Sequence, residues 1–176
     1  NKKKQRMKII PRFQQYEGAN KIVERVVEGK IKQGLIWHFQ GSGKSLLMVF
    51  AAQKLRREAK LKSPTVIVLV DRTDLDTQIS GIFNAADIAN VESTESIREL
   101  QQMLERDTRK IIVSTIHKFR DAKPNMNTRD NIIVLVDEAH RTQEGDLGRQ
   151  MRAALPNAFL FGLTGTPVNK ADKNTF

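Results

Sequence analysis

Residues 38–45, which read His-Phe-Gln-Gly-Ser-Gly-Lys-Ser, combine the residue types that bind a polyphosphate. Gly41 and Gly43 allow backbone conformations that turn N–H groups inward around phosphate oxygens. The ammonium group of Lys44 would reach the β- and γ-phosphates of a nucleotide, and the hydroxyl of Ser45 would reach a bound magnesium ion. The segment therefore predicts a site for ATP and Mg²⁺ whose nucleotide contacts come from Gly41, Ser42, Gly43, Lys44 and Ser45.

The first position of this segment departs from the common phosphate-loop pattern, because His38 stands where that pattern has glycine. The departure weakens a strict match. The Gly-Ser-Gly-Lys-Ser core follows a strand-like run and opens a helix-like one, and the positive end of such a helix points at a bound anion. The alternative is a glycine-rich turn followed by an ordinary surface lysine.

A second group of chemically active residues, Asp137-Glu138-Ala139-His140, follows an apolar run that ends at residue 136. Ligands gather at the carboxyl ends of the strands in parallel sheets. Asp137 is then placed to hold magnesium, directly or through water, and Glu138 to polarise the attacking water. We therefore expect Lys44 and Glu138 to be the catalytic residues. Two adjacent carboxylates can equally cap a helix, but the phosphate loop upstream favours the nucleotide site.

Residues 163–167, Leu-Thr-Gly-Thr-Pro, follow the last apolar run of the chain. The hydroxyl groups of Thr164 and Thr166 can hydrogen-bond to His140 or Glu138 and shift with the nucleotide state. These residues are therefore candidates for coupling the nucleotide to movement. Taken alone, the segment is typical of a simple turn.

Apolar runs alternate with amphipathic stretches along the chain, which is typical of a parallel sheet with connecting helices. Apolar runs predict strands over 34–39, 65–70, 110–114, 132–136 and 158–163, and the fully apolar, β-branched run at 65–70 is typical of a buried parallel strand. Apolar residues at helical spacing predict helices over 46–59, 74–83 and 145–155, and one that carries Ile97, Leu100 and Leu104. We expect an α/β fold with a mostly parallel central sheet and helices on both faces.

The bulk properties fit one globular domain with an anionic partner. The chain has 176 residues, a formal net charge of +10 and no cysteine. The charge favours a polyanion such as nucleic acid, although a solvated basic surface with a charged tail is the simpler alternative. The missing cysteines exclude disulfides and thiolate metal sites. No apolar run approaches the roughly 20 residues needed to span a bilayer, so we expect a cytoplasmic protein with no membrane partner.

In this order, the motifs resemble the first RecA-like lobe of superfamily 2 helicases and translocases, and more closely the motor (R) subunit of type I restriction enzymes. In that family a tryptophan and a histidine commonly precede the phosphate-loop core, as Trp37 and His38 do here. The resemblance implies a RecA-like three-layer sandwich over residues 11–170, between a basic edge or linker, 1–10, and an edge, 171–176, that leads to a second lobe. The motifs that carry it lie at 35–46, 70–78, 114–119, 137–143 and 163–167.

The resemblance also implies contacts to the adenine base and to nucleic acid. Residues 11–16 resemble the family's adenine-recognition segment, in which the amide of Gln15 would pair with adenine through one donor and one acceptor. Phe13 or Tyr16 would stack on the base. Phosphate contacts to duplex DNA, which position a strand without reading its sequence, would come from Arg72, Thr73, Thr115 and Lys118. The alternative is that these four are loop residues that cap helices.

As a whole, the resemblance implies an ATPase with Mg²⁺ that moves duplex DNA for a type I restriction complex. Its partners would be the second RecA-like lobe of the same parent chain and the modification and specificity subunits. The nuclease of such a complex needs an aspartate before a Glu-x-Lys triplet, whereas both triplets here, 28–30 and 58–60, precede the first aspartate, Asp71. We therefore expect no nuclease site in this segment. The alternatives are another superfamily 2 motor, such as a type III restriction subunit or a remodeller, and a nucleotide-gated DNA-binding module that is inactive in isolation.

Overall fold

The computed structural model describes the chain from residue 9 onward, with short gaps. The described residues are 9–39, 41–70, 79–84, 88–138 and 145–165, together with the backbone of 169–170 and 173–174. They form a six-stranded sheet and a two-stranded antiparallel hairpin. Among the described residues, no helix has the length and apolar character needed to cross a membrane.

The central sheet is parallel throughout, with the strand order β1-β6-β5-β2-β4-β3. The residues of β2, β4, β5 and β6 are all buried, because helices cover both faces and the strands carry almost continuous apolar side chains. The strands span Gln33–Trp37 (β1), Thr65–Val70 (β2), Val91–Ser93 (β3), Ile111–Thr115 (β4), Ile132–Asp137 (β5) and Phe159–Thr164 (β6). The hairpin pairs Asn169–Lys170 (β7) with Lys173–Asn174 (β8).

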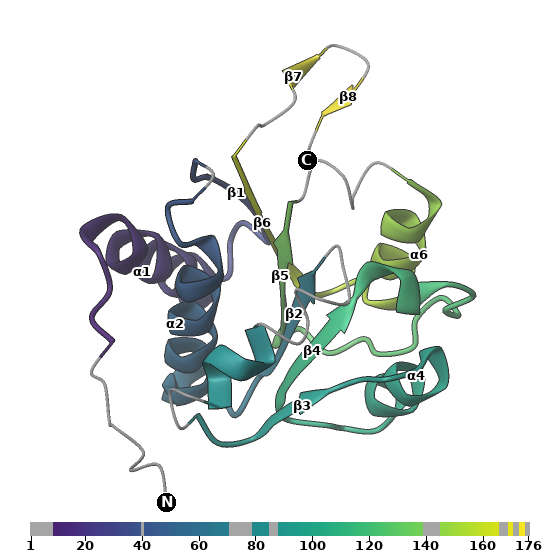
Figure 1. Cartoon of the computed structure of the whole chain (residues 1–176). Helices are drawn as coiled ribbons and strands as arrows, with labels where there is room; N and C mark the ends of the chain where they lie inside the picture. Colours follow the sequence, from purple (N-terminus) through teal and green to yellow (C-terminus); the bar gives the residue numbers. More distant parts are fainter. Residues whose placement is uncertain are drawn as a thin grey trace, which may run out of the picture.

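Helices pack on both faces of the sheet (Figure 1). The sheet separates two clusters of buried hydrophobic side chains. One face carries α1 (Phe13–Glu28), α2 (Lys44–Arg57) and the helical residues 79–84; the other carries α4 (Ile97–Glu105), α6 (Asp146–Ala154) and the short helix η2 (Ile116–Phe119). A further short helix, η1, spans Ala59–Leu61. Successive side chains of a strand point to opposite faces, so Val66 and Val68 join the α1–α2 cluster while Ile67 and Leu69 join the other. This is the expected three-layer α/β sandwich.

The expected strands and most of the expected helices are present. The strand predicted at 65–70 has the same bounds in the structure, and the other four differ by one or two residues at an end. The helix predicted at 74–83 overlaps the helical residues 79–84, and its first part lies outside the described residues. β3 and α1 were not predicted from the sequence, although α1 carries a readable signal: Ala19, Ile22 and Val26 are buried at helical spacing.

Candidate nucleotide-binding site

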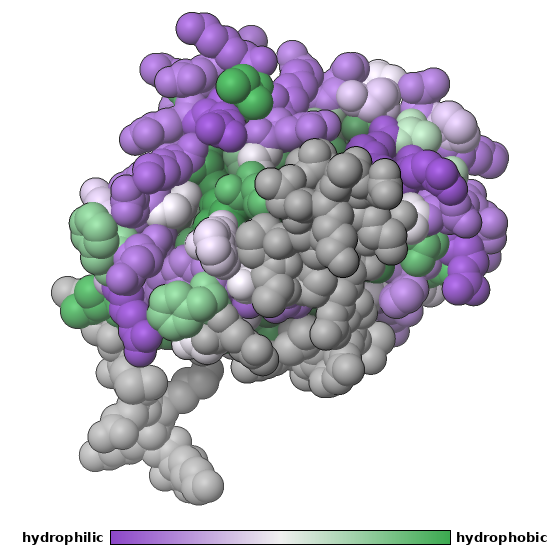
Figure 2. Space-filling view, turned by 90° about the horizontal axis from the view of Figure 1, so that it is seen from above, coloured by the Kyte–Doolittle hydropathy of each residue, from purple (hydrophilic) through white to green (hydrophobic). Residues whose placement is uncertain are grey.

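The predicted nucleotide-site residues that the structure describes gather at the carboxyl edge of the sheet. The phosphate loop follows the end of β1 and leads into α2, while β5 ends in Asp137 and β6 in Thr164. β6 lies between β1 and β5, so the loop and the acidic pair belong to strands that are not neighbours. Figure 2 shows the molecule from above, and the described residues visible there are mostly hydrophilic, with hydrophobic ones in smaller patches.

The phosphate loop presents unused backbone donors. Gly41 and Gly43 have positive φ angles of 79° and 88°, in the left-handed region that suits glycine. A Cβ on Gly43 would also lie 2.2 Å from the side-chain nitrogen of Gln15. α2 begins at Lys44, and no side chain caps its first turn. The first hydrogen bond of the helix runs from the Leu47 N–H to the Gly43 carbonyl. Within the described part of the chain, the N–H groups of Gly41, Gly43, Lys44 and Ser45 have no acceptor, which is the arrangement that binds an anion.

Lys44 and Glu138 form an ion pair that joins the two halves of the site. Their Nζ and Oε1 atoms lie 2.9 Å apart, and the side chains are 9% and 27% exposed. Glu138 has a left-handed backbone with φ 48°, and its N–H donates to the Asp137 carboxylate at 3.0 Å. The turn thereby directs the Glu138 carboxylate at the phosphate-loop lysine. Nucleotide phosphates would compete with this carboxylate for the same ammonium group.

Ser45 and Asp137 are the residues that would hold magnesium. Asp137 is buried at the end of β5, and Ser45 is half-buried in the first turn of α2. Magnesium usually keeps several waters and takes one or two carboxylates together with substrate phosphates. One carboxylate and one hydroxyl beside a phosphate loop fit that requirement. The described residues accordingly hold no cluster of three or more His, Cys, Asp or Glu side chains that would form an all-protein cage.

Gln15 is buried against the phosphate loop rather than open to a base. Its side-chain Nε2 donates to the carbonyls of Ser42 and Gly43, both at 3.2 Å, and its Oε1 accepts from the Arg12 N–H at 2.9 Å. The side chain therefore ties the start of α1 to the loop. Pairing with adenine through this amide would require some of these bonds to be exchanged.

Two exposed aromatic residues stand near Gln15 on α1. Most of the surface of Phe13 and about half of that of Tyr16 is open to solvent. The ammonium group of Lys54 lies 5.0 Å from the centre of the Tyr16 ring. Both rings are therefore available for the predicted stacking on a base.

The predicted DNA contacts are described only in part. Thr115 is buried at the end of β4, and the ammonium group of Lys118 donates to the carbonyl of Thr94. A phosphate contact by Lys118 would require release of that carbonyl. Arg72 and Thr73 lie outside the described residues, as do the coupling candidates His140 and Thr166.

Trp37 and His38 link the start of the phosphate loop to the last residue of β6 and to the residue after it, a connection that the sequence did not reveal. The His38 N–H donates to the Thr164 carbonyl at 2.9 Å, and the Trp37 indole N–H donates to the Gly165 carbonyl at 3.0 Å. Trp37 is held in this way although most of its side chain is exposed. The sequence shows both motifs, but their contact depends on β1 and β6 being neighbours, which the sequence alone does not reveal.

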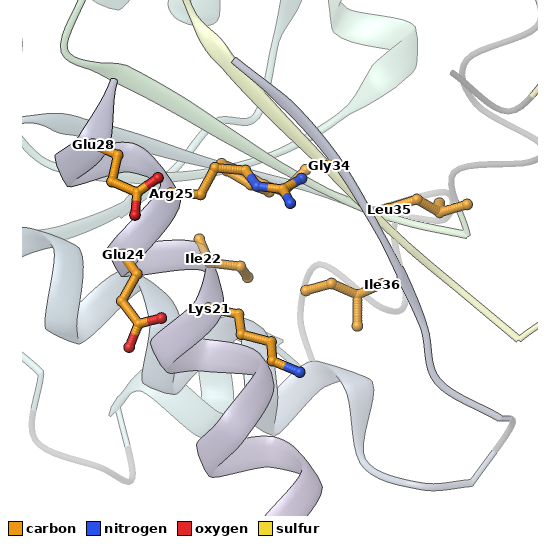
Figure 3. A pocket seen from close by; sticks show the side chains of 9 residues that line it. Lys21, Ile22, Glu24, Arg25, Glu28, Gly34, Leu35 and Ile36 are labelled. Carbon is orange, nitrogen blue, oxygen red and sulfur yellow. The ribbon is translucent and has the colours of Figure 1, made fainter. Parts of the chain in front are cut away.

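A separate hollow of about 340 Å³ lies between α1 and β1 (Figure 3). Its apolar lining comes from Ile22, Leu35, Ile36 and Phe161. Two lysine or arginine residues and two glutamates of α1 also line it, so its charges balance. None of the predicted nucleotide residues lines this hollow, which is therefore distinct from the phosphate site.

Fold and site together define the class of this protein as a RecA-like ATPase lobe with a phosphate loop. Residues 14–176 match the SWI2/SNF2 ATPase family, and the chain belongs to that family. A solved structure, the SWI2/SNF2 ATPase core of Sulfolobus solfataricus in complex with dsDNA, has the same fold. The likeness has a TM-score of 0.67 at 16% identity and covers 96% of this chain and 35% of that one.

Similar curated proteins are subunits of type I restriction enzymes. The chain is 36% identical to the MjaIXP endonuclease subunit of Methanocaldococcus jannaschii, over 96% of this chain and 17% of that protein. It is also 36% identical to the HindI endonuclease subunit of Haemophilus influenzae, over 96% of this chain and 18% of that protein. This chain therefore spans less than a fifth of the length of these relatives.

Proposed function

We propose that this chain is the ATP-binding lobe of a DNA translocase in which ATP hydrolysis drives movement along duplex DNA within a type I restriction endonuclease complex. The similarity to endonuclease subunits of type I restriction enzymes supports the restriction complex. The solved SWI2/SNF2 ATPase core in complex with dsDNA supports the duplex substrate. The formal net charge of +10 is positive, as binding to the negatively charged DNA backbone requires.

The observation that carries the proposal is the ion pair between Lys44 and Glu138, 2.9 Å apart. It places a carboxylate that can polarise water beside the cation that would hold the terminal phosphates. In phosphoryl transfer the protein contributes mainly position and charge. The free N–H groups of the loop would hold the phosphates, Lys44 would stabilise the charge on the γ-phosphate, and Glu138 would orient the attacking water.

Ser45 and Asp137 would hold Mg²⁺, which neutralises charge on the β- and γ-phosphates when bound. Hydrolysis would be sensed next to the loop, because Trp37 and His38 are bonded to the backbone of residues 164 and 165. We propose that Thr164 and Thr166 transmit the change toward DNA, and that a second RecA-like lobe of the parent chain completes the nucleotide site.

The experiment is ATP titration by calorimetry on the chain with Lys44→Ala. Removing a charged partner from a largely desolvated site costs roughly 2–4 kcal/mol, which is a loss of about 30-fold to 1000-fold in affinity. Lys123→Ala removes an exposed lysine and is the matched control. Unchanged affinity for Lys44→Ala would refute the phosphate-site assignment.

A further inference from the structure

We propose that His38 is a positioning residue of the phosphate loop: its neutral imidazole donates from Nδ1 to the Ser42 hydroxyl and so holds the loop open for phosphate. The proposal rests on the proposed function, because it concerns the same nucleotide site. It gives a specific role to the residue that replaces the first glycine of the common motif.

Hydrogen bonds around Ser42 fix which imidazole nitrogen carries the hydrogen. The Ser42 hydroxyl contacts both the Phe39 carbonyl and Nδ1 of His38. A carbonyl can only accept, so the single hydroxyl hydrogen belongs to the bond with Phe39. The hydroxyl oxygen must then accept from His38, and Nδ1 carries the hydrogen. This assignment leaves Nε2 with a bare lone pair.

The surroundings of the ring favour this neutral form. His38 is 7% exposed, and its Nε2 has no hydrogen-bond partner within the described residues. Burial, followed by the charge of Lys44, lowers the pKa of the imidazole below its ordinary value. A protonated ring would bury a second N–H with no acceptor next to that cation. With the hydrogen on Nδ1, the buried Nε2 is an acceptor rather than a donor, and the bond at Nδ1 is the one that holds the ring.

The hydrogen bond between His38 and Ser42 joins the first residue of the phosphate loop to the fifth. Each polar group of Ser42 has a partner. Its N–H donates to the Phe39 carbonyl at 3.2 Å, and its hydroxyl bonds to the same carbonyl and to His38. Its carbonyl accepts from the side chain of Gln15. These bonds turn Ser42 toward the protein. Its neighbours in the loop, Gly41 and Gly43, are left with unused N–H groups within the described residues. Ser42 would therefore shape the site rather than contact phosphate, which narrows the set of contacts expected from the motif.

The role can be tested with two amides that imitate different halves of the ring. Asparagine places a donor near the position of Nδ1, and glutamine places one near Nε2, while alanine removes both. We expect His38→Asn to bind ATP within about threefold of wild type. His38→Gln and His38→Ala should each lose about tenfold, the usual size of one lost hydrogen bond to a loop of this kind. Calorimetry on the full chain gives the affinities, and thermal unfolding confirms that each variant is folded.

Ser42→Ala supplies an independent route to the same interaction. It should lose a similar factor of about ten, and His38→Ala in that background should cause little further loss, because the two groups act as one unit. Full additivity of the two substitutions, or equal affinities for His38→Asn and His38→Ala, would overturn the proposal. Lys44→Ala separates the two claims: if it abolishes ATP binding while all His38 variants bind as wild type, this inference fails and the ATP site stands.

Discussion

At the scale of single residues, the site is organised by the pairing of Lys44 with Glu138. The Lys44 side chain is mostly buried, and its ammonium group is paired with the Glu138 carboxylate. A bound γ-phosphate would need the same ammonium group. Binding of ATP must therefore replace one anion with another at Lys44. We propose that this exchange redirects the Glu138 carboxylate from Lys44 toward the attacking water.

This exchange predicts the behaviour of Glu138→Gln. The amide keeps the shape of the side chain but loses the charge that competes for Lys44, so ATP affinity should stay equal to wild type or increase. Hydrolysis in the parent motor should fall strongly, since an amide cannot accept a proton or polarise water as a carboxylate does. Fluorescent-nucleotide titration and phosphate release measure the two effects. Wild-type turnover by this variant would show that another residue positions the water.

At the scale of elements, Gln15 connects α1 to the phosphate loop through the carbonyls of Ser42 and Gly43. Gln15→Ala should lower the free energy of unfolding by roughly 1–3 kcal/mol, because it leaves the buried carbonyl of Ser42 without its partner. If the same amide also reads adenine, the preference for ATP over GTP should narrow.

Chemical unfolding and nucleotide competition separate these two roles of Gln15. Gln14→Ala is the matched control, since Gln14 is exposed on the preceding position of α1. Lower stability with an unchanged ATP-to-GTP ratio would assign Gln15 to the architecture of the loop alone. A ratio that changes in Gln14→Ala instead would move adenine recognition by one residue.

The elements differ in how much of them the sequence could predict. β2 and β5 are apolar along almost their whole length, so their existence and bounds follow from pattern alone. β3 has three residues and is partly polar, which leaves no periodic signal. The residue types of the site could be predicted from motifs. The contacts from Lys44 to Glu138 and from Trp37 to Gly165 could not, because they depend on strand order and on the left-handed turn at Glu138.

At the scale of the whole molecule, the described residues form one RecA-like lobe with its nucleotide loop at the carboxyl edge of the sheet. The similar restriction subunits are more than five times as long as the matched region. We propose that the nucleotide lies between this lobe and a second one, which contributes an arginine to the transition state. The phosphate contacts of the first lobe would hold substrate and transition state about equally, so we expect turnover to stay low without that arginine.

The most direct test is steady-state phosphate release by residues 1–176 compared with the intact parent protein, each with and without duplex DNA. An arginine of this kind is worth about 10³–10⁵ in rate in related phosphoryl-transfer enzymes. The account predicts that the chain binds ATP, releases phosphate slower than the parent by a factor of that order, and gains little from DNA. Equal DNA-stimulated rates would contradict it, because the lobe would then be catalytically complete by itself.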